Sequence, residues 1–211
     1  MYNGVANEKC AMKSENFFCI DLELNNKNDK TVPKIIQVGC AFANISTPDD
    51  IKVFSWYLDP QEPIAPFITK LTGITDEIIK EKSVSHEIVA QELGELLRFY
   101  EIHSSPVVWG GSPKFSDSEE LKVEFRERGI DFPFFGNRVI DVKTIFTFNQ
   151  ILKQRTKKSG LQKAMKSYGL DFVGKAHNAE DDARNTLRFF FHLLYRQKTF
   201  EDFGDVMKGM K

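Results

Sequence analysis

The chain has few cysteines, almost no net charge and no long apolar run, and each absence excludes a class of protein. Its three cysteines are an odd, sparse set that makes a poor disulfide framework and fits a reducing compartment. A formal net charge of −1 gives no global attraction to nucleic acid or membranes, so any polyanion site must be local. No apolar stretch approaches the roughly 20 residues that span a bilayer, and the N-terminus lacks a secretion signal. We expect a cytoplasmic protein without a membrane partner; a nucleus or organelle stays an open alternative.

The length and the patterning indicate one α/β domain. A chain of 211 residues can build one substantial core, and 41% hydrophobic and 28% charged residues are ordinary for a globular domain. We expect a polar tail over residues 1–15, a domain over 16–197 and a second tail over 198–211. The chain has three strand-like runs first and then helices that alternate with strands. This order predicts a mixed sheet flanked by helices.

The sequence predicts five strands and seven helices. The first three strands are closely spaced, which favours an antiparallel meander. The expected strands cover about residues 17–24, 34–43, 51–58, 106–109 and 139–141. The expected helices cover about residues 66–71, 76–80, 86–100, 118–128, 141–152, 161–168 and 180–195.

Two carboxylates lie one residue apart in the first apolar strand. Side chains alternate along a strand, so Asp21 and Glu23 share one face and Leu22 points to the other. Two like charges on one face repel each other and lose hydration unless a cation joins them. Mg²⁺ prefers such oxygen ligands, and two such ions can clamp both oxygens exchanged in a phosphodiester displacement. The pair indicates a metal-dependent phosphodiesterase, with a solvated face of an edge strand as the plainer alternative.

A histidine stands five residues before a carboxylate at the start of the last helical pattern. The acidic first turn explains Glu180 and Asp181, because the helix dipole favours negative charge there. It does not explain His177 ahead of Asp182. An imidazole on a loop near a metal site could accept a proton from water, whereas the plainer alternative is a solvated loop histidine.

A third acid follows the short apolar run at residues 106–109. Asp117 lies between a strand end and a helix start, which is where α/β sheets place ligands. It could equally be the N-cap of that helix.

Together these residues resemble the three sequence blocks of the DEDDh 3′–5′ exonucleases, the DnaQ-like group. The blocks are Asp21-x-Glu23, an Asp at a strand–helix junction, and His177-x-x-x-x-Asp182. Within the group, residues 174–185 are similar to the third block of the Eri-type and KapD-like exoribonucleases. The second block departs from the pattern, because Trp109-Gly110-Gly111 replaces a lead-in that contains Asn in many relatives. Asp141, in a later strand-like run, is therefore the alternative to Asp117 as the third acid. The resemblance covers about residues 17–195 and implies an RNase H-like fold.

The resemblance also implies the roles of these residues. Asp21, Glu23, Asp117 and Asp182 would hold two Mg²⁺ or Mn²⁺ ions, and His177 would act as general base on the attacking water. The reaction would release nucleoside 5′-monophosphates from the 3′ ends of single-stranded nucleic acid or overhangs. Similarity to the Eri-type branch favours RNA over DNA, which stays open.

Two segments are candidates for substrate binding. Leu71, Gly73, Ile74 and Thr75 resemble the segment that approaches the substrate 3′ end in that family. Lys157 and Lys158 belong to a basic cluster that could contact phosphates; solvated lysines are the alternative.

Two other functions fit the same residues. The first is a catalytically silent RNase H-like module that binds nucleic acid, against which the complete acid and histidine set argues. The second is an endonuclease of the wider superfamily, although the His177–Asp182 block favours an exonuclease. Metal titration distinguishes the first from an active enzyme, and a circular substrate distinguishes the second.

Overall fold

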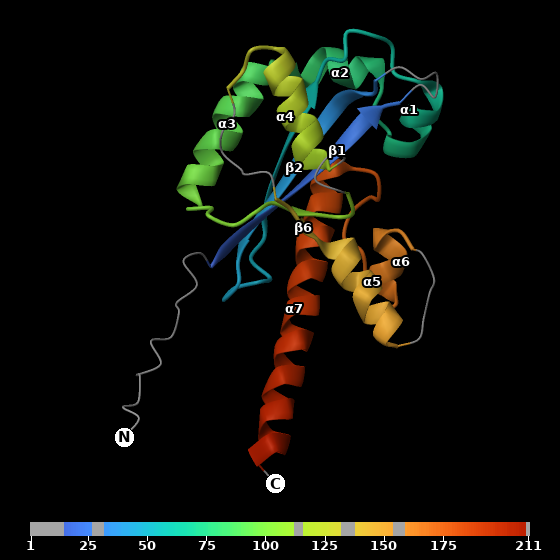
Figure 1. Ribbon diagram of the computed structural model, residues 1–211. Coiled ribbons are helices and arrows are strands. Elements are labelled where there is room, and N and C mark those ends of the chain that lie inside the picture. Colours follow the sequence, from blue (N-terminus) through green and yellow to red (C-terminus); the bar gives the residue numbers. More distant parts are fainter. Residues whose placement is uncertain (1–14, 27–31, 112–115, 132–137, 154–158, 210–211) are drawn as a thin grey trace.

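The fold is a six-stranded sheet with helices on both faces (Figure 1), seen in a computed structural model. The structure describes residues 15–26, 32–111, 116–131, 138–153 and 159–209, with side chains up to residue 196. The strands are ordered β4-β3-β2-β1-β5-β6 across the sheet. The predicted mixed sheet with helices on its sides is therefore confirmed.

The three long strands form the predicted antiparallel meander. β1 (Asn16–Asn25) pairs with β2 (Lys34–Asn44), and β2 pairs with β3 (Lys52–Leu58), both antiparallel. Two short strands, β5 (Val107–Val108) and β6 (Ile140–Asp141), extend the sheet in parallel beyond β1. The central position of β1 gives it neighbours on both edges, which fits its apolar composition.

The predicted strand number is wrong by one. A two-residue strand, β4 (Ser83–Val84), pairs in parallel with β3 at the edge of the sheet. Its Ser-Val pair lies between two helical patterns and forms no apolar run of the kind that predicted β5.

Seven helices surround the sheet in the described part of the chain. All seven predicted helices are present, with differences of a few residues at most of their ends. They are α1 (Pro66–Thr72), α2 (Asp76–Lys82), α3 (His86–Phe99), α4 (Asp117–Glu127), α5 (Val142–Leu152), α6 (Leu161–Lys166) and α7 (Ala179–Gly209).

The last helix is longer than its apolar stripe predicts. α7 continues past residue 195 to Gly209, and its C-terminal half extends away from the other elements (Figure 1). The expected boundary at residue 198 therefore lies inside one continuous helix. Most of the expected N-terminal tail, residues 1–14, lies outside the described residues.

The alternation along β1 separates two apolar cores. Phe18, Ile20 and Leu22 pack with α3 and α4 on one face. Phe17 and Cys19 pack with α5, α6 and α7 on the other. The prediction that Leu22 points away from its two acidic neighbours is confirmed, and Asp21 and Glu23 belong to the face that α7 covers.

Candidate active site

The two acids of β1 lie on the sheet face where α7 begins. Asp21 stands opposite Gly39 of β2, and Glu23 stands opposite Gln37. Glu23 is only 8% exposed and Asp21 is partly buried, although both are ionisable. Carboxylates in such a place are costly unless a cation joins them, so this end of the sheet requires an electrostatic explanation.

Gly39 and Gln37 place the start of α7 over these acids. A Cβ added to Gly39 would lie 2.1 Å from the backbone carbon of Ala179, so only glycine permits this approach. The Gln37 Oε1 accepts a hydrogen bond from the Ala179 backbone N–H at 3.2 Å. Neither residue is among those expected from the sequence. A glycine inside an apolar strand is a usable signal of close backbone approach, whereas nothing in the sequence distinguishes Gln37.

The loop before α7 brings His177 to the acids. His177 has a left-handed backbone with φ of 62°, and its N–H donates to the Asp182 Oδ2 at 2.8 Å. Ligand atoms of Glu23, His177 and Asp182 all lie within 4.8 Å of one another. Three predicted site residues from two segments far apart in the sequence therefore form one cluster with the spacing of a metal site.

Asp117 joins the site from α4, the helix that packs on the sheet face opposite to α7. It is the first residue of α4, and the N-cap is Ser116, whose Oγ accepts from the Glu119 N–H at 3.4 Å. The alternative that Asp117 itself caps the helix is therefore wrong. The charge of Asp117 raises the pKa of Asp21 and of Glu23. The three carboxylates therefore belong to one electrostatically interacting cluster.

The four carboxylates oppose one another's ionisation. The pKa of Glu23 is raised to about 8, by burial first and then by the charges of Asp182 and Asp117, against the ammonium of Lys175, which lowers it. Burial also raises the pKa values of Asp21, Asp117 and Asp182, and for Asp21 the charges of Asp117, Asp182 and Glu23 act in the same direction. An oxygen-rich cluster of this kind fits a hard divalent cation, which would restore the ionised form.

Asp141, the alternative third acid, is occupied by structural contacts. Its Oδ1 accepts from the backbone N–H groups of Gly110 and Lys143, both at 2.9 Å, and its Oδ2 accepts from the Thr144 hydroxyl at 2.6 Å. It is the N-cap of α5 and ties that helix to the end of β5. These contacts favour Asp117 as the third acid of the site.

A pair of substitutions distinguishes the two aspartates. Asp117→Asn is expected to abolish the nuclease activity that the resemblance implies, without lowering the free energy of unfolding. Asp141→Ala is expected to keep the activity and to lower the free energy of unfolding by about 1–2 kcal/mol, because an N-cap is lost. Urea denaturation and a nuclease assay on both variants check this, and the opposite pattern would assign the third acid to Asp141.

The predicted 3′-end segment lies at the corner between α1 and α2. Gly73 adopts a left-handed φ of 83° there, and Leu71 is 44% exposed. Thr75 is the N-cap of α2, while Ile74 is buried with Ile36, Ile64 and Ile68. Only the backbone of Ile74 is thus available for a ligand. The other candidates, Lys157 and Lys158, lie outside the described residues.

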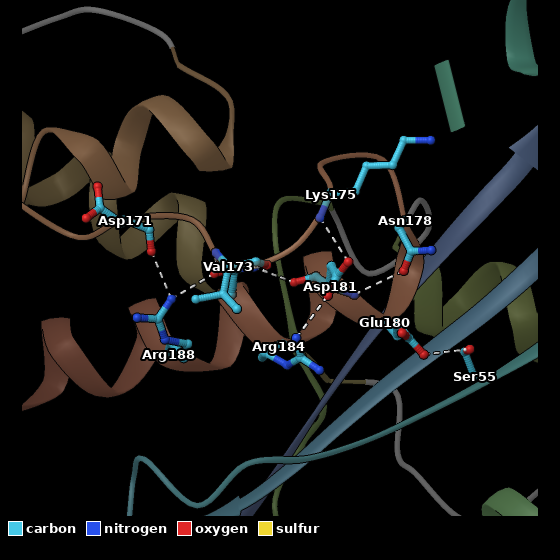
Figure 2. A network of polar contacts seen from close by, with 10 residues as sticks. Ser55, Asp171, Val173, Lys175, Asn178, Glu180, Asp181, Arg184 and Arg188 are labelled. Atoms are coloured by element: carbon cyan, nitrogen blue, oxygen red, sulfur yellow. Dashed lines mark hydrogen bonds and ion pairs between the residues drawn. The ribbon is translucent and has the colours of Figure 1, made fainter. Parts of the chain in front are cut away.

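The acidic first turn of α7 does more than complement the helix dipole. Figure 2 shows Asp181 at the centre of a polar network, where its Oδ2 accepts from the Lys175 N–H at 2.9 Å and its Oδ1 pairs with Arg184 at 3.0 Å. Glu180 accepts from the Ser55 hydroxyl at 2.9 Å. The Lys175 bond fixes the loop that carries His177 to α7, and the Ser55 bond fixes the first turn of α7 to β3, roles that composition alone did not reveal.

Comparison with known proteins identifies the class to which this fold and site belong. The RNase_T family model, described as an exonuclease, matches residues 18–190. The chain belongs to this exonuclease family. The resemblance to DEDDh exonucleases of the Eri type, inferred from the three sequence blocks, is thereby confirmed.

The relatives by sequence include one that is named an exoribonuclease and one that is named a DNA polymerase. The mouse (Mus musculus) protein "ERI1 exoribonuclease 2" is 27% identical over 188 residues, which are 79% of this chain and 27% of that protein. The "DNA polymerase III PolC-type" of Caldanaerobacter subterraneus is 26% identical, over 90% of this chain and 12% of that protein. The chain thus spans less than a third of the length of these relatives.

Solved structures share the fold. The nuclease domain of 3′hExo, a DEDDh family member bound to rAMP, superposes with a TM-score of 0.72 at 18% identity, over 87% of this chain and 94% of that one. Cell-death related nuclease 4 gives a TM-score of 0.73 at 18% identity, over 87% of this chain and 64% of that one.

None of the helices in the described ranges has the length and apolar character of a membrane span.

Proposed function

We propose that the chain is a metal-dependent 3′–5′ exonuclease that removes nucleoside 5′-monophosphates from single-stranded 3′ ends, with RNA favoured over DNA. One observation carries the proposal: ligand atoms of Glu23, on β1, and of His177 and Asp182, at the start of α7, come within 4.8 Å of one another, beside Asp21 and Asp117. The names of the Eri-type relatives support RNA as substrate. The domain at residues 16–197 and the cytoplasm as place of action are part of this proposal.

In this proposal, Asp21, Glu23, Asp117 and Asp182 hold two Mg²⁺ or Mn²⁺ ions. The donor set fits, because it consists of carboxylate oxygens whose raised pKa values reflect negative charge in a buried place. When bound, such ions supply the positive charge that lets an anionic phosphodiester approach the acids, and they stabilise charge on its oxygens.

His177 is the proposed general base. Its side chain is exposed on a loop, and its backbone is fixed by the hydrogen bond to Asp182. The imidazole takes a proton from the attacking water, whose oxygen bonds to the terminal phosphorus while the bond to the neighbouring 3′ oxygen breaks. The leaving 3′ oxygen takes a proton from solvent, so the shortened strand ends in a 3′-hydroxyl, and the departing nucleotide keeps the 5′-phosphate.

The corner between α1 and α2 is the proposed seat of the terminal nucleoside. The exposed Leu71 offers apolar surface, and Gly73 permits close backbone approach. Ile74 would contribute backbone contacts and Thr75 its partly exposed surface. Lys157 and Lys158 remain candidate phosphate contacts from the sequence.

A DNA-directed exonuclease is the second candidate, favoured by the matches to the PolC-type polymerase and to the "3'-5' exonuclease DinG" of Bacillus subtilis. Matched single-stranded RNA and DNA, labelled at the 5′ end, test both with Mg²⁺ or Mn²⁺, with Asp21→Asn as control. A ladder that shortens from the 3′ end, and that EDTA and Asp21→Asn abolish, supports the proposal, and the faster substrate sets its class. Binding without cleavage supports the silent module, and cleavage of a circular strand supports an endonuclease.

Replacing the proposed base should separate proton transfer from metal binding. His177→Asn is the better variant, because asparagine tolerates the left-handed backbone at this position. We expect the rate to fall about 10²–10⁴-fold while the affinity for Mn²⁺, measured by calorimetry, is kept. A large loss of Mn²⁺ affinity would instead make His177 a ligand.

A further inference from the structure

Lys175 joins two parts of the site that the sequence separates by about a hundred residues. Its backbone N–H donates to the Asp181 Oδ2 at 2.9 Å, which fixes the backbone of Lys175 to α7. Its side chain points away from that contact (Figure 2), and its ammonium donates to the Thr72 carbonyl oxygen at 2.7 Å. One residue therefore links the His177 loop to the corner between α1 and α2.

The backbone around Lys175 packs tightly against the first turn of α7. A Cβ added to Gly174 would lie 2.3 Å from the Asp181 carboxylate, so the loop lies directly against that side chain. Asp181 is also paired with Arg184 at 3.0 Å and belongs to the first turn of α7. The position of the Lys175 backbone is thus determined by the same turn that supplies Asp182.

The tip of the link contacts the end of α1. Thr72 is the last residue of α1, where backbone carbonyls lack helical partners and the helix dipole favours a cation. A Cβ added to Gly73 would lie 2.4 Å from the Lys175 Nζ, so the ammonium lies against the glycine. This glycine and its neighbours are the proposed seat of the terminal nucleoside.

The same ammonium acts on the acid cluster. Its charge lowers the pKa of Glu23, against burial and the charges of Asp182 and Asp117, which raise it. Lys175 thus contacts the proposed seat of the nucleoside and acts electrostatically on a proposed metal ligand. Its own hydrogen bond to a neutral carbonyl does not neutralise its charge.

We propose that Lys175 is a positioning residue that holds the corner at Thr72 and Gly73 in register with the His177 loop. The inference rests on the proposed function, because the register matters only if the corner seats a 3′ nucleotide. Without the ammonium, the two segments move independently, and the terminal phosphodiester is misplaced relative to His177 and the acids. Such misplacement reduces turnover more than it reduces binding of the nucleic acid as a whole.

The test compares Lys175→Met, Lys175→Arg and the matched control Lys70→Met, an exposed lysine in the last turn of α1. For Lys175→Met we expect kcat on a 5′-labelled single strand to fall roughly 10–100-fold with a smaller change in KM. Lys175→Arg should recover most of kcat, and Lys70→Met should match the wild type. Full activity of Lys175→Met, or loss only in proportion to unfolded protein, overturns the proposal.

Hydrogen exchange gives a second measurement that does not depend on activity. Lys175→Met should speed amide exchange in peptides covering residues 72–75 and 174–178 together, while Lys70→Met leaves residues 174–178 unchanged. Unchanged exchange in either segment of Lys175→Met overturns the link. If the wild type cleaves neither RNA nor DNA, the proposed function fails on its own, and exchange still decides whether Lys175 joins the two segments.

Discussion

Glu23→Gln is expected to abolish activity and at the same time to stabilise the metal-free protein. The variant loses a proposed metal ligand, and a loss of about 4 kcal/mol of transition-state stabilisation corresponds to roughly 10³-fold in rate. The same change removes a carboxylate that is 8% exposed and surrounded by other acids. We expect the free energy of unfolding without metal to rise by about 2 kcal/mol at pH 7.

The direction of the stability change follows from the raised pKa. Glu23 has a pKa of about 8 in the folded protein against an ordinary value of 4.5, so the folded state binds its proton more tightly. The stability that this proton contributes is fully present below about pH 4.5 and is lost as the pH rises through about 8. The raised pKa values of Asp21, Asp117 and Asp182 act in the same direction.

Urea denaturation at several pH values, with EDTA or with Mn²⁺, measures this effect. Wild-type protein in EDTA should lose stability between about pH 5 and 8, and Mn²⁺ should restore it, because a cation favours the ionised acids. Glu23→Gln should flatten the pH dependence and weaken the response to Mn²⁺. The control is Glu180→Gln in the first turn of α7. This variant removes an acid whose carboxylate accepts a hydrogen bond from the Ser55 hydroxyl. Equal pH profiles for wild type and Glu23→Gln would contradict the assignment of the acid cluster.

Local patterns in the sequence predicted the parts of the site that depend on local geometry. The alternation of side chains along β1 is a backbone property, so it placed Asp21 and Glu23 on one face and Leu22 in the opposite core. The short connections between the first three strands likewise limited them to a meander. The order and spacing of the acids agreed with the exonuclease family whose model matches residues 18–190.

The remaining contacts depend on tertiary structure, which no local pattern contains. Ile74 reads as part of a substrate segment, but its side chain completes a small core with α1 and α2. In sequence, Asp181 only complements the helix dipole. In the fold, its carboxylate accepts from the Lys175 N–H of the loop and pairs with Arg184. In each case the partner lies on another turn or another element, so its identity follows only from the fold.

The Lys175 contact shows the same limit over a longer distance. Its ammonium reaches the carbonyl of Thr72, which precedes it by 103 residues. A lysine in a polar loop is ordinary in sequence, because solvated lysines are common. The packing of α7 against the sheet brings this one to the end of α1.

Gly39→Ala is expected to have the largest effect on folding of any single methyl addition considered for this site. The new Cβ would lie 2.1 Å from the Ala179 carbon and 2.4 Å from the Glu180 nitrogen, both backbone atoms that no side-chain rotation can move. Because α7 must shift away from β2, we expect a loss of about 3 kcal/mol or more in the free energy of unfolding.

The same shift should inactivate the enzyme even in molecules that remain folded. Ala179 is bonded to Gln37, and three residues later Asp182 supplies a ligand atom to the cluster with Glu23 and His177. A displacement of about 1 Å at a catalytic group can cost 10²-fold in rate. Activity per folded molecule, with folded fractions from urea denaturation, checks this expectation.

Gly160→Ala is the matched control. Gly160 precedes α6, and an added Cβ there has nothing within 4 Å, so we expect less than about 1 kcal/mol change in stability and unchanged activity. If Gly39→Ala behaved like Gly160→Ala, α7 would not be held against β2 as described. The acids of β1 and the His177 loop would then need another reason to meet, because the contact at Gly39 is what brings the first turn of α7 onto the sheet.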